Sequence, residues 1–383
     1  MIPRAEQMEE QSLSKLKLLC PCLFGLESIL AGEIKRMGGD EVQVSDGKVT
    51  FWGDSSMVAR ANLNLRTAER VMIVLGQFIA QSFEELFQGV KALPLENFIG
   101  EKDRFPVKGW SINSKLASVP DCQSIVKKAA VERLKEKYGI SWFEETGELF
   151  QLQFSILKNE VTVMLDSSGV GLHKRGYRKN AMEAPIKETL AAGIVDLARI
   201  KPDSVLFDPF CGSGTFLIEG ATKAMNIAPG INRRFVSENW QAIPENVWRE
   251  ERQRCFDLIR RDASFTAYGS DIDPESILLS EHNAKKAGVS SRIKFKRADI
   301  ADFEPSVKNG ILICNPPYGE RLLDLKQAEE IYKTMGKRFL PSMLNYYIIT
   351  PHDQFEKLFG RPATKRRKLY NGMIKCQLYM YFK

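Results

Sequence analysis

The sequence predicts an α/β protein whose C-terminal half forms a doubly wound parallel sheet with an antiparallel edge. From about residue 186, short apolar runs rich in β-branched residues alternate with helical patterns, which is typical of βα units. The last two predicted strands follow each other directly, and strands joined in this way pair antiparallel. In the N-terminal half the strands alternate in polarity, as expected of sheets with one solvated face.

Two smaller α/β domains are predicted to precede this sheet. Residues 1–65 predict a strand at 16–20, a helix at 26–37, and two short strands around the Ser45-Asp46-Gly47 turn. Residues 66–166 predict a second domain, with a lysine-rich helix at 123–138 and strands at 70–76, 105–111, 150–157 and 160–165. Residues 167–185 are expected to link it to a third domain.

The third predicted domain, at 186–383, alternates between helix and strand. Its strands are expected at 204–208, 266–271, 293–297, 311–314 and 346–350, with a closing pair at 365–371 and 373–382. Its helices are expected at 186–198, 215–225, 274–287, 325–340 and 353–359. A further helical segment at 235–261 is rich in aromatic residues and arginine, and its Trp240 and Trp248 are expected to pack inward.

Composition excludes several classes of protein. No stretch approaches the roughly 20 apolar residues that cross a bilayer, so no membrane partner is expected. Met1–Gln11 is polar, which predicts no secretory signal, and the seven scattered cysteines are expected to be reduced thiols in the cytoplasm. Cys20 and Cys22 form a close pair without histidine partners, so no metal is expected. The net charge of +7 permits binding to a polyanion.

The most informative motif is Asn315-Pro316-Pro317-Tyr318, at the carboxyl end of the strand predicted at 311–314. Open α/β sheets bind their ligands at this end of the strands. The two prolines stiffen the backbone and lack N–H donors, which leaves carbonyls free to accept hydrogen bonds. The Asn315 side-chain oxygen and the Pro316 carbonyl can accept from an amino group, and Tyr318 can stack on a flat ring. The motif therefore favours a nucleobase with an exocyclic amino group, and leaves guanine and adenine open.

Three earlier strand ends have residues that suit a nucleotide-like cofactor. Asp208 is followed by a Gly-x-Gly turn at 212–214 and a helix start at Thr215, where a bare backbone and free N–H groups let a ligand approach. Asp271 can accept from both hydroxyls of a ribose, and Asp299 can accept from an adenine amino group. The turn lacks the third glycine of the dinucleotide fingerprint and the lysine of a phosphate-binding loop.

Residues 180–383, which contain these four strand ends, resemble a class I S-adenosylmethionine-dependent methyltransferase that methylates amino groups. DNA adenine-N6 and RNA guanine-N2 enzymes of this type share the Asn-Pro-Pro-Tyr motif. Further segments resemble THUMP-containing RNA methyltransferases: Cys22–Glu27, Pro120–Ser124, Ser167–Arg178, Ala184–Ala192 and Leu369–Gly372. The resemblance covers nearly the whole chain and is strongest to bacterial enzymes that methylate N2 of a guanosine in 23S ribosomal RNA.

The resemblance implies a fold and a role for each domain. Residues 1–65 would form a ferredoxin-like domain and 66–166 a THUMP domain, and together they would bind RNA. Residues 186–383 would form a Rossmann-like class I domain that transfers a methyl group from S-adenosylmethionine to N2 of guanosine. Some bacterial relatives have a second methyltransferase domain, so a chain that stops at Lys383 is expected to be a stand-alone form.

Together with the motifs, the resemblance implies roles for individual residues. The expected cofactor-binding residues are Asp208, Phe210, Gly212, Gly214, Thr215, Asp271, Ile272, Asp299, Ile300 and Asn315. The expected catalytic residues are Asn315, Pro316, Pro317 and Tyr318. The cations expected to bind RNA are Lys127, Lys128, Lys174, Arg175, Arg178, Arg366 and Arg367.

Three other functions stay open at this point. A transfer RNA guanine-N2 methyltransferase is one, because THUMP proteins also act on transfer RNA. A DNA adenine-N6 methyltransferase is another, although the THUMP-like segment argues against it. A catalytically inactive RNA-assembly factor is the third, and the complete set of strand-end motifs argues against that. The sequence does not predict the oligomeric state.

Overall fold

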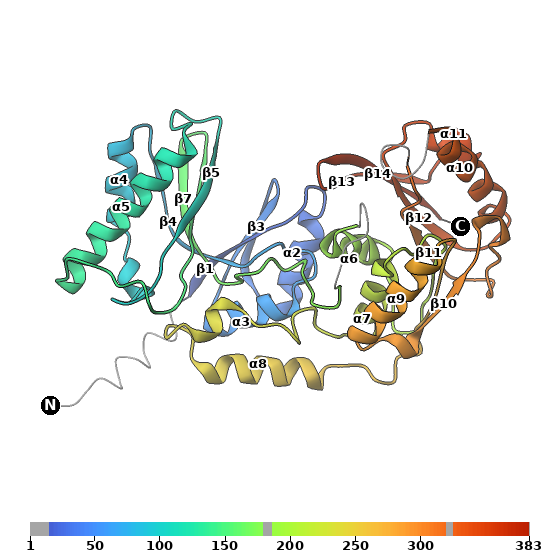
Figure 1. The fold of residues 1–383 in the computed structure, drawn as a ribbon, viewed down its shortest axis with the longest axis horizontal. Coiled ribbons are helices and arrows are strands. Elements are labelled where there is room, and N and C mark those ends of the chain that lie inside the picture. Colours follow the sequence, from blue (N-terminus) through green and yellow to red (C-terminus); the bar gives the residue numbers. More distant parts are fainter. Residues whose placement is uncertain (1–14, 179–185, 319–324, 383) are drawn as a thin grey trace.

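The computed structural model describes residues 15–178, 186–318 and 325–382. Met1–Gln11 and residues 179–185, which end the expected linker, lie outside the described residues. Figure 1 shows an elongated molecule with a sheet and its helices towards each end of the long axis.

The described N-terminal residues form one seven-stranded sheet, in the order β2-β3-β1-β4-β7-β6-β5. Its strands are β1 (Leu16–Pro21), β2 (Asp40–Ser45), β3 (Lys48–Gly53), β4 (Met72–Ile79), β5 (Val107–Ile112), β6 (Leu152–Leu157) and β7 (Glu160–Asp166). β1 pairs with β4, where Leu18 lies opposite Ile73 and Leu19 opposite Met72. The strands of the two predicted N-terminal domains therefore belong to a single sheet.

The helices that pack on this sheet are α2 (Glu27–Met37), α3 (Ser55–Asn64), α4 (Phe83–Lys91) and α5 (Val119–Tyr138). α4 begins where the Ser82 side chain accepts a hydrogen bond from the Glu85 N–H. α5 has a proline in its first turn and ends at Gly139, whose φ of 68° is the left-handed conformation that favours glycine. α4 and α5 lie side by side at one end of the molecule (Figure 1).

The described C-terminal residues form a second sheet, in the order β10-β9-β8-β11-β12-β14-β13. Its strands are β8 (Val205–Asp208), β9 (Thr266–Asp271), β10 (Ile293–Arg297), β11 (Ile311–Cys314), β12 (Asn345–Thr350), β13 (Lys365–Asn371) and β14 (Ile374–Tyr381). The first five strands in that order are parallel, whereas β14 pairs antiparallel with both β12 and β13. The predicted doubly wound sheet with an antiparallel edge is confirmed.

The strand order reverses between β8 and β11. The chain proceeds outward from β8 through β9 to β10, and then returns to the other side of β8 as β11. Helices cover the sheet: α6 (Glu188–Leu197), α7 (Thr215–Ala224), α9 (Pro274–Lys286), α10 (Leu325–Phe339) and α11 (Phe355–Phe359). In open α/β sheets, such a reversal creates a crevice at the carboxyl ends of the two central strands. The fold therefore brings Asp208 and Asn315, which end β8 and follow β11, to one crevice.

The segment between α7 and β9 packs on the N-terminal half of the molecule. It contains α8 (Glu245–Asp257), which runs beside α3 (Figure 1). Trp240 stacks on Phe150 with ring centroids 4.5 Å apart, and Trp248 is also buried in the N-terminal core. The inward packing predicted for both tryptophans is confirmed, and their partner is the N-terminal domain.

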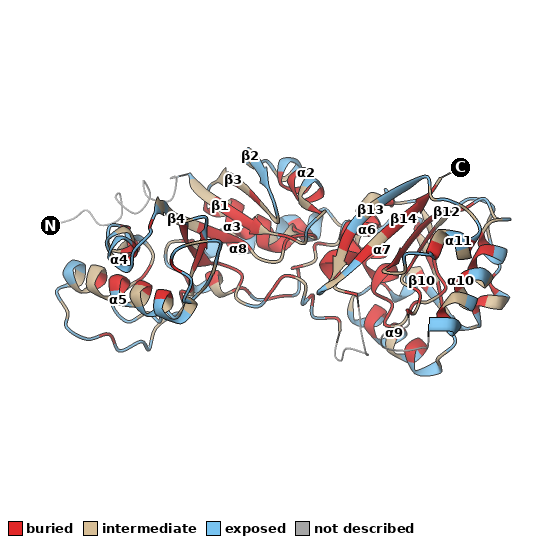
Figure 2. Ribbon diagram, turned by 90° about the horizontal axis from the view of Figure 1, so that it is seen from above, coloured by how far each residue is buried: buried red, intermediate tan, exposed pale blue. Residues whose placement is uncertain are grey.

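Burial follows the two sheets. Figure 2 shows buried residues on the strands of both sheets and exposed residues on the outer turns of helices such as α5 and α9. The seven cysteines are buried and free, in agreement with the predicted reduced thiols. Within the described residues, no helix combines the length and the apolar character needed to cross a bilayer.

Candidate active site

A cavity of about 820 Å³ opens at the carboxyl ends of β8, β9, β10 and β11. Its volume lies in the range of roughly 300–1,000 Å³ that is usual for small-molecule sites. Asp208, Asp271, Asp299 and Asn315 all line it, so the four strand ends share one site. Other expected site residues also line it: Phe210, Gly212, Thr215, Ile272, Ile300, Pro316, Pro317 and Tyr318.

Asp208 is a buried carboxyl group at the floor of the β8 end. It is 1% exposed, and its Oδ1 accepts a hydrogen bond from the Phe210 N–H at 3.1 Å. Burial raises the pKa of Asp208 well above its ordinary value, and the neighbouring charge of Asp271 adds to this rise. Removal from water therefore favours the neutral form of this carboxyl group in the cofactor-free chain.

The glycine turn contributes one of its two glycines to the cavity. Gly212 has a φ of 50°, and a Cβ added there would meet no atom within 4 Å, so the backbone borders open space. Gly214 does not line the cavity. A Cβ at Gly214 would lie 3.0 Å from that of Ser280, because this glycine packs against α9 at the start of α7. Gly214 therefore lies behind the cavity lining, and a contact between this glycine and the cofactor stays a prediction.

The other two acids lie at neighbouring strand ends and keep acceptor capacity. Asp271 is the last residue of β9, and its carboxylate accepts hydrogen bonds from the N–H groups of Gly212 at 3.0 Å and Asp273 at 3.1 Å. Partial burial raises the pKa of Asp271. Asp299 accepts from the Ala301 N–H at 2.8 Å. Each carboxylate has further lone pairs that can accept from a ligand.

The Asn-Pro-Pro-Tyr turn is fixed by a residue that the sequence analysis missed. The buried Tyr332 of α10 donates its hydroxyl hydrogen to the Pro317 carbonyl at 3.2 Å. The same hydroxyl lies 3.0 Å from Oγ1 of Thr350, at the end of β12. Burial raises the pKa of Tyr332 to about 12, so the hydroxyl stays protonated and able to donate. The Pro317 carbonyl is thus engaged, whereas Asn315 and Pro316 line the cavity.

Further cavity residues come from helices that the sequence predicts but does not place at the cavity. Ile186 precedes α6, Ser276 begins α9, and Glu330 and Thr334 lie four apart on one face of α10. The helical pattern at 325–340 predicts α10, but periodicity alone does not say that its polar face borders a cavity.

The cations expected to bind RNA fall into different environments. Lys128 and Lys174 are exposed. Lys127 pairs with Glu145, and Arg366 pairs with Glu356. The other two have partners inside the protein. Arg178 pairs with Glu188 at 3.1 Å, and the Arg367 Nε donates to the Gly25 carbonyl at 2.9 Å. For these six residues, an RNA contact stays a prediction.

Arg175 is an internal residue, and the expectation that it contacts RNA is not compatible with its position. Its Nε lies 3.5 Å from the buried Glu219 carboxylate, and its terminal nitrogens donate to the Leu172 and Arg66 carbonyls. The Tyr177 hydroxyl donates to the same carboxylate at 3.0 Å. Arg175 therefore joins the two halves of the molecule from inside, and its guanidinium is not available to a phosphate.

The lining of the cavity fits S-adenosylmethionine. Asp271 and Asp299 provide carboxylate acceptors in the lining, and Ile272 and Ile300 beside them provide apolar walls. The open space at Gly212 leaves room for a chain along the backbone. An elongated ligand with a polar sugar and a flat ring suits this set of donors, acceptors and walls.

Known domain families match successive parts of the chain. Residues 17–72 match the RlmL ferredoxin-like domain, and residues 80–166 match the THUMP domain. Residues 175–380, more than half of the chain, match the methyltransferase domain described as RMKL-like. The order of the expected domains is the same, and the boundaries predicted at 65, 166 and 186 stay predictions.

Individual relatives extend these matches. “Putative RNA methyltransferase YpsC” of Bacillus subtilis is 45% identical, over 97% of both chains. “Ribosomal RNA large subunit methyltransferase K/L” of Shewanella frigidimarina is 32% identical over 93% of this chain, which spans about half (51%) of that protein.

Solved structures give the same family at the level of the fold. SMU.472, crystallised as a complex with SAH, is 41% identical, with a TM-score of 0.92 over 96% of this chain and 98% of that one. A Listeria monocytogenes protein described as a “predicted N6-adenine-specific DNA methylase” is 46% identical, with a TM-score of 0.93 over 98% of both chains. The chain therefore belongs to the RMKL-like family of S-adenosylmethionine-dependent methyltransferases, with an RlmL-type ferredoxin-like domain and a THUMP domain preceding its methyltransferase domain.

Proposed function

We propose that this chain transfers the methyl group of S-adenosylmethionine to the exocyclic N2 of a guanosine in large-subunit ribosomal RNA. The observation that supports this most directly is that the Asn-Pro-Pro-Tyr turn and the acidic strand ends line one cavity. A cofactor held by the acids and a base held at the turn would then share that cavity. The THUMP match and the name of the K/L relatives favour ribosomal RNA as the substrate.

The cofactor would be held by residues of three strand ends. Asp271 would accept from the ribose hydroxyls, Asp299 from the adenine amino group, and Gly212 would leave room for the methionine part. When bound, S-adenosylmethionine supplies an electrophilic methyl group on a positively charged sulfur.

The turn at 315–318 would prepare the amino group of the base. The lone pair of this nitrogen is delocalised into the ring, so the amino group is a poor nucleophile until it becomes pyramidal. The Asn315 side-chain oxygen and the Pro316 carbonyl would accept its two N–H groups and stabilise the positive charge that develops on nitrogen. Tyr332 holds the turn through the Pro317 carbonyl, which keeps these acceptors in place. The proton can leave after transfer, so no strong base is required.

The base must leave any helix to enter the cavity. Unstacking costs a few kcal/mol, and stacking on the Tyr318 ring would recover part of that cost. A single-stranded or loop target would lower the cost further. The ferredoxin-like and THUMP domains would hold the surrounding RNA while the base is in the cavity.

A second candidate is methylation of adenine N6. The same two acceptors suit that amino group, and the Listeria relative has a name that refers to adenine in DNA. The THUMP domain favours RNA over duplex DNA, and the K/L relatives favour ribosomal RNA.

Incubation with labelled S-adenosylmethionine separates these functions. The substrates are unmodified 23S ribosomal RNA, transfer RNA and duplex DNA, and the product is identified after digestion to nucleosides. We expect label in N2-methylguanosine from ribosomal RNA. N6-methyladenine would overturn the guanine assignment, and label confined to transfer RNA would overturn the ribosomal one. Cofactor binding without transfer to any substrate would favour an RNA-assembly factor.

A further inference from the structure

Arg233 is a buried cation without a carboxylate partner among the described residues. It lies between α7 and η2 (Val236–Asn239) and is 9% exposed. Its side chain donates one hydrogen bond within this part of the chain, to the Val170 carbonyl at 2.6 Å. The guanidinium carbon also lies 5.1 Å from the Phe235 ring centroid. A guanidinium has five N–H donors, so most of its donor capacity has no acceptor in the described protein.

The surroundings of Arg233 are positively charged. Burial, together with the charges of Arg175 and Arg70, lowers the pKa of Arg233 to about 10. The residue therefore remains a cation at neutral pH, at a cost in free energy. A buried charge without a counter-charge is destabilising unless something outside the free chain compensates it.

Unlike Arg233, the neighbouring arginines each have a carboxylate partner among the described residues. Arg70 pairs with Asp166, Arg175 with Glu219 and Arg252 with Glu238. Each of these ion pairs neutralises a guanidinium inside the protein. The described contacts of Arg233 are the Val170 carbonyl and the Phe235 ring, and neither has a full negative charge. The cluster as a whole has an excess of positive charge, and Arg233 is the member that lacks a described counter-ion.

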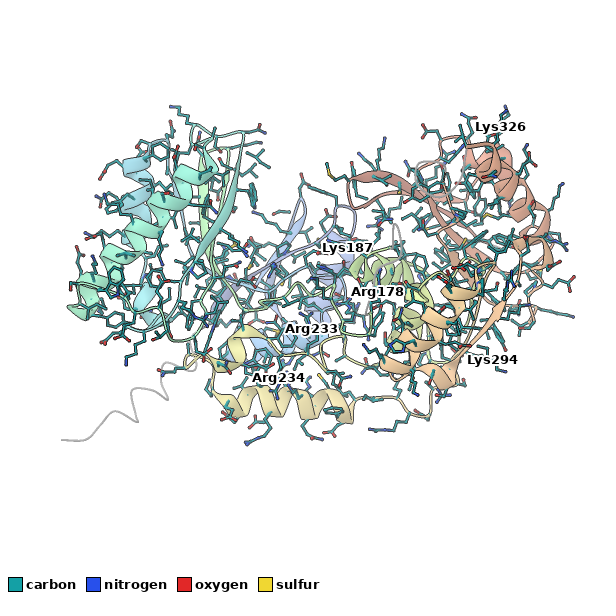
Figure 3. All side chains as sticks on the ribbon, viewed as in Figure 1. Arg178, Lys187, Arg233, Arg234, Lys294 and Lys326 are labelled. Atoms are coloured by element: carbon teal, nitrogen blue, oxygen red, sulfur yellow. The ribbon has the colours of Figure 1, made fainter. Side chains whose placement is uncertain are left out.

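Arg233 lies near the junction of the N-terminal sheet and the methyltransferase domain. Its partner Val170 belongs to the loop that leaves β7, and the same loop contacts Glu69 through His173 at 3.3 Å. Glu69 also pairs with Lys187 at 3.0 Å, and Lys187 follows Ile186, which lines the cavity. In Figure 3, Arg233 and Lys187 lie in the middle of the molecule, between the two sheets.

We propose that Arg233 binds a backbone phosphate of the RNA substrate at the junction between the N-terminal sheet and the methyltransferase domain. This inference rests on the proposed RNA methyltransferase function. A phosphate has the charge that the cluster lacks, and two of its oxygens match the fork of N–H donors of a guanidinium. Contacts of this kind position the RNA backbone and do not read its sequence. The site would fix the RNA on its way from the THUMP domain to the cavity.

The test compares Arg233→Gln with Arg234→Gln. Both substitutions remove one positive charge from adjacent positions, and the Arg234 side chain is 90% exposed, so it is the matched control. Glutamine at position 233 keeps a polar side chain and removes the charge. The probe is a 23S ribosomal RNA fragment that the wild-type chain methylates, and the Kd is measured by fluorescence anisotropy between about 50 and 200 mM salt.

We expect Arg233→Gln to weaken RNA binding roughly 10-fold or more, since charge-assisted hydrogen bonds are lost. The slope of log K against log salt should fall by about 1. Arg234→Gln should change the Kd less than about 3-fold. Urea unfolding should show Arg233→Gln at least as stable as the wild type, because an uncompensated buried charge has been removed. A residue with a purely structural role would give the opposite sign.

The results that would overturn the inference are distinct from those that bear on the proposed function. Unchanged affinity and salt slope in a folded Arg233→Gln chain, or equal losses in both variants, would overturn it. If Arg233→Gln does not fold, Arg233→Lys should fold and bind several-fold more weakly, because it keeps the charge and loses the fork. Failure of both variants to fold would show a structural role and overturn the inference. Absence of RNA binding by the wild-type chain would overturn the proposed function as well.

Discussion

Replacement of Tyr332 by phenylalanine tests whether the conformation of the Asn-Pro-Pro-Tyr turn depends on the hydrogen bond from Tyr332. The Tyr332 hydroxyl donates to the Pro317 carbonyl and also bonds to the Thr350 hydroxyl. Because a tyrosine hydroxyl has one hydrogen, donation to Pro317 leaves Thr350 as the donor in the second bond. Phenylalanine fills the same space, removes both bonds, and leaves the buried Thr350 hydroxyl without this acceptor.

The size of the effect follows from these two bonds. A hydrogen bond contributes about 1 kcal/mol net, and a buried polar group left unpaired costs about 1–3 kcal/mol. Tyr332→Phe should therefore lower the free energy of unfolding by about 2–3 kcal/mol. Thr350→Val removes one of the two bonds, so the double variant should lose about 1 kcal/mol less than the sum of the single losses.

Two measurements check this prediction. Urea unfolding of the wild type, both single variants and the double variant gives the coupling energy. Turnover on methylatable RNA at saturating cofactor gives kcat, which should fall about 10-fold in Tyr332→Phe because the acceptors at the turn are less well positioned. The Kd for S-adenosylmethionine should stay the same. Strictly additive losses, or an unchanged kcat, would refute the supporting role of Tyr332.

Three further predictions concern the cavity and the buried ion pairs. Asn315→Ala should lower kcat by about 100-fold, since one acceptor for the amino group is lost. Any loss of cofactor affinity in calorimetry should be smaller than this, and full turnover would contradict the role of Asn315 in transfer. The raised pKa of Asp208 means that the folded chain keeps a proton which the unfolded chain releases above about pH 4. The free energy of unfolding should therefore fall as pH rises above that value, and Asp208→Asn should flatten the fall; equal pH slopes would disprove the linkage. Glu219→Ala should lower the free energy of unfolding in urea by about 3–5 kcal/mol, because it leaves Arg175 buried and without its counter-charge. The control, Asp40→Ala, removes an exposed carboxylate and should cost less than about 1 kcal/mol. Similar losses in the two variants would contradict the argument.

The elements of the second sheet could be predicted closely from the sequence. Strands expected at 266–271 and 311–314 occur as β9 and β11 with the same bounds. Central parallel strands are buried on both faces, so they give continuous apolar runs that are easy to recognise. By contrast, α3 was not predicted. It lies between β3 and α8 and is buried on most sides, so its polar stripe is narrow and consists of Ser56, Arg60 and Asn64.

The candidate site could be predicted only where its residues follow strands. Asp208, Asp271, Asp299 and Asn315 were found because the fold itself places strand ends together. Tyr332 and Arg175 could not be assigned in this way. Their functions depend on partners far along the chain, Pro317 and Glu219, and a local pattern does not contain that information.

The pairing of β4 with both β1 and β7 determines how the N-terminal half can be divided and how it can move. A fragment that begins at residue 66 would lose β1 and leave one edge of β4 with unsatisfied backbone groups. Such an edge is a template for pairing with another chain, so the isolated THUMP segment should aggregate. For the same reason, the first two domains cannot swing independently of each other. A motion that delivers an RNA target to the cavity would therefore move the ferredoxin-like and THUMP strands together.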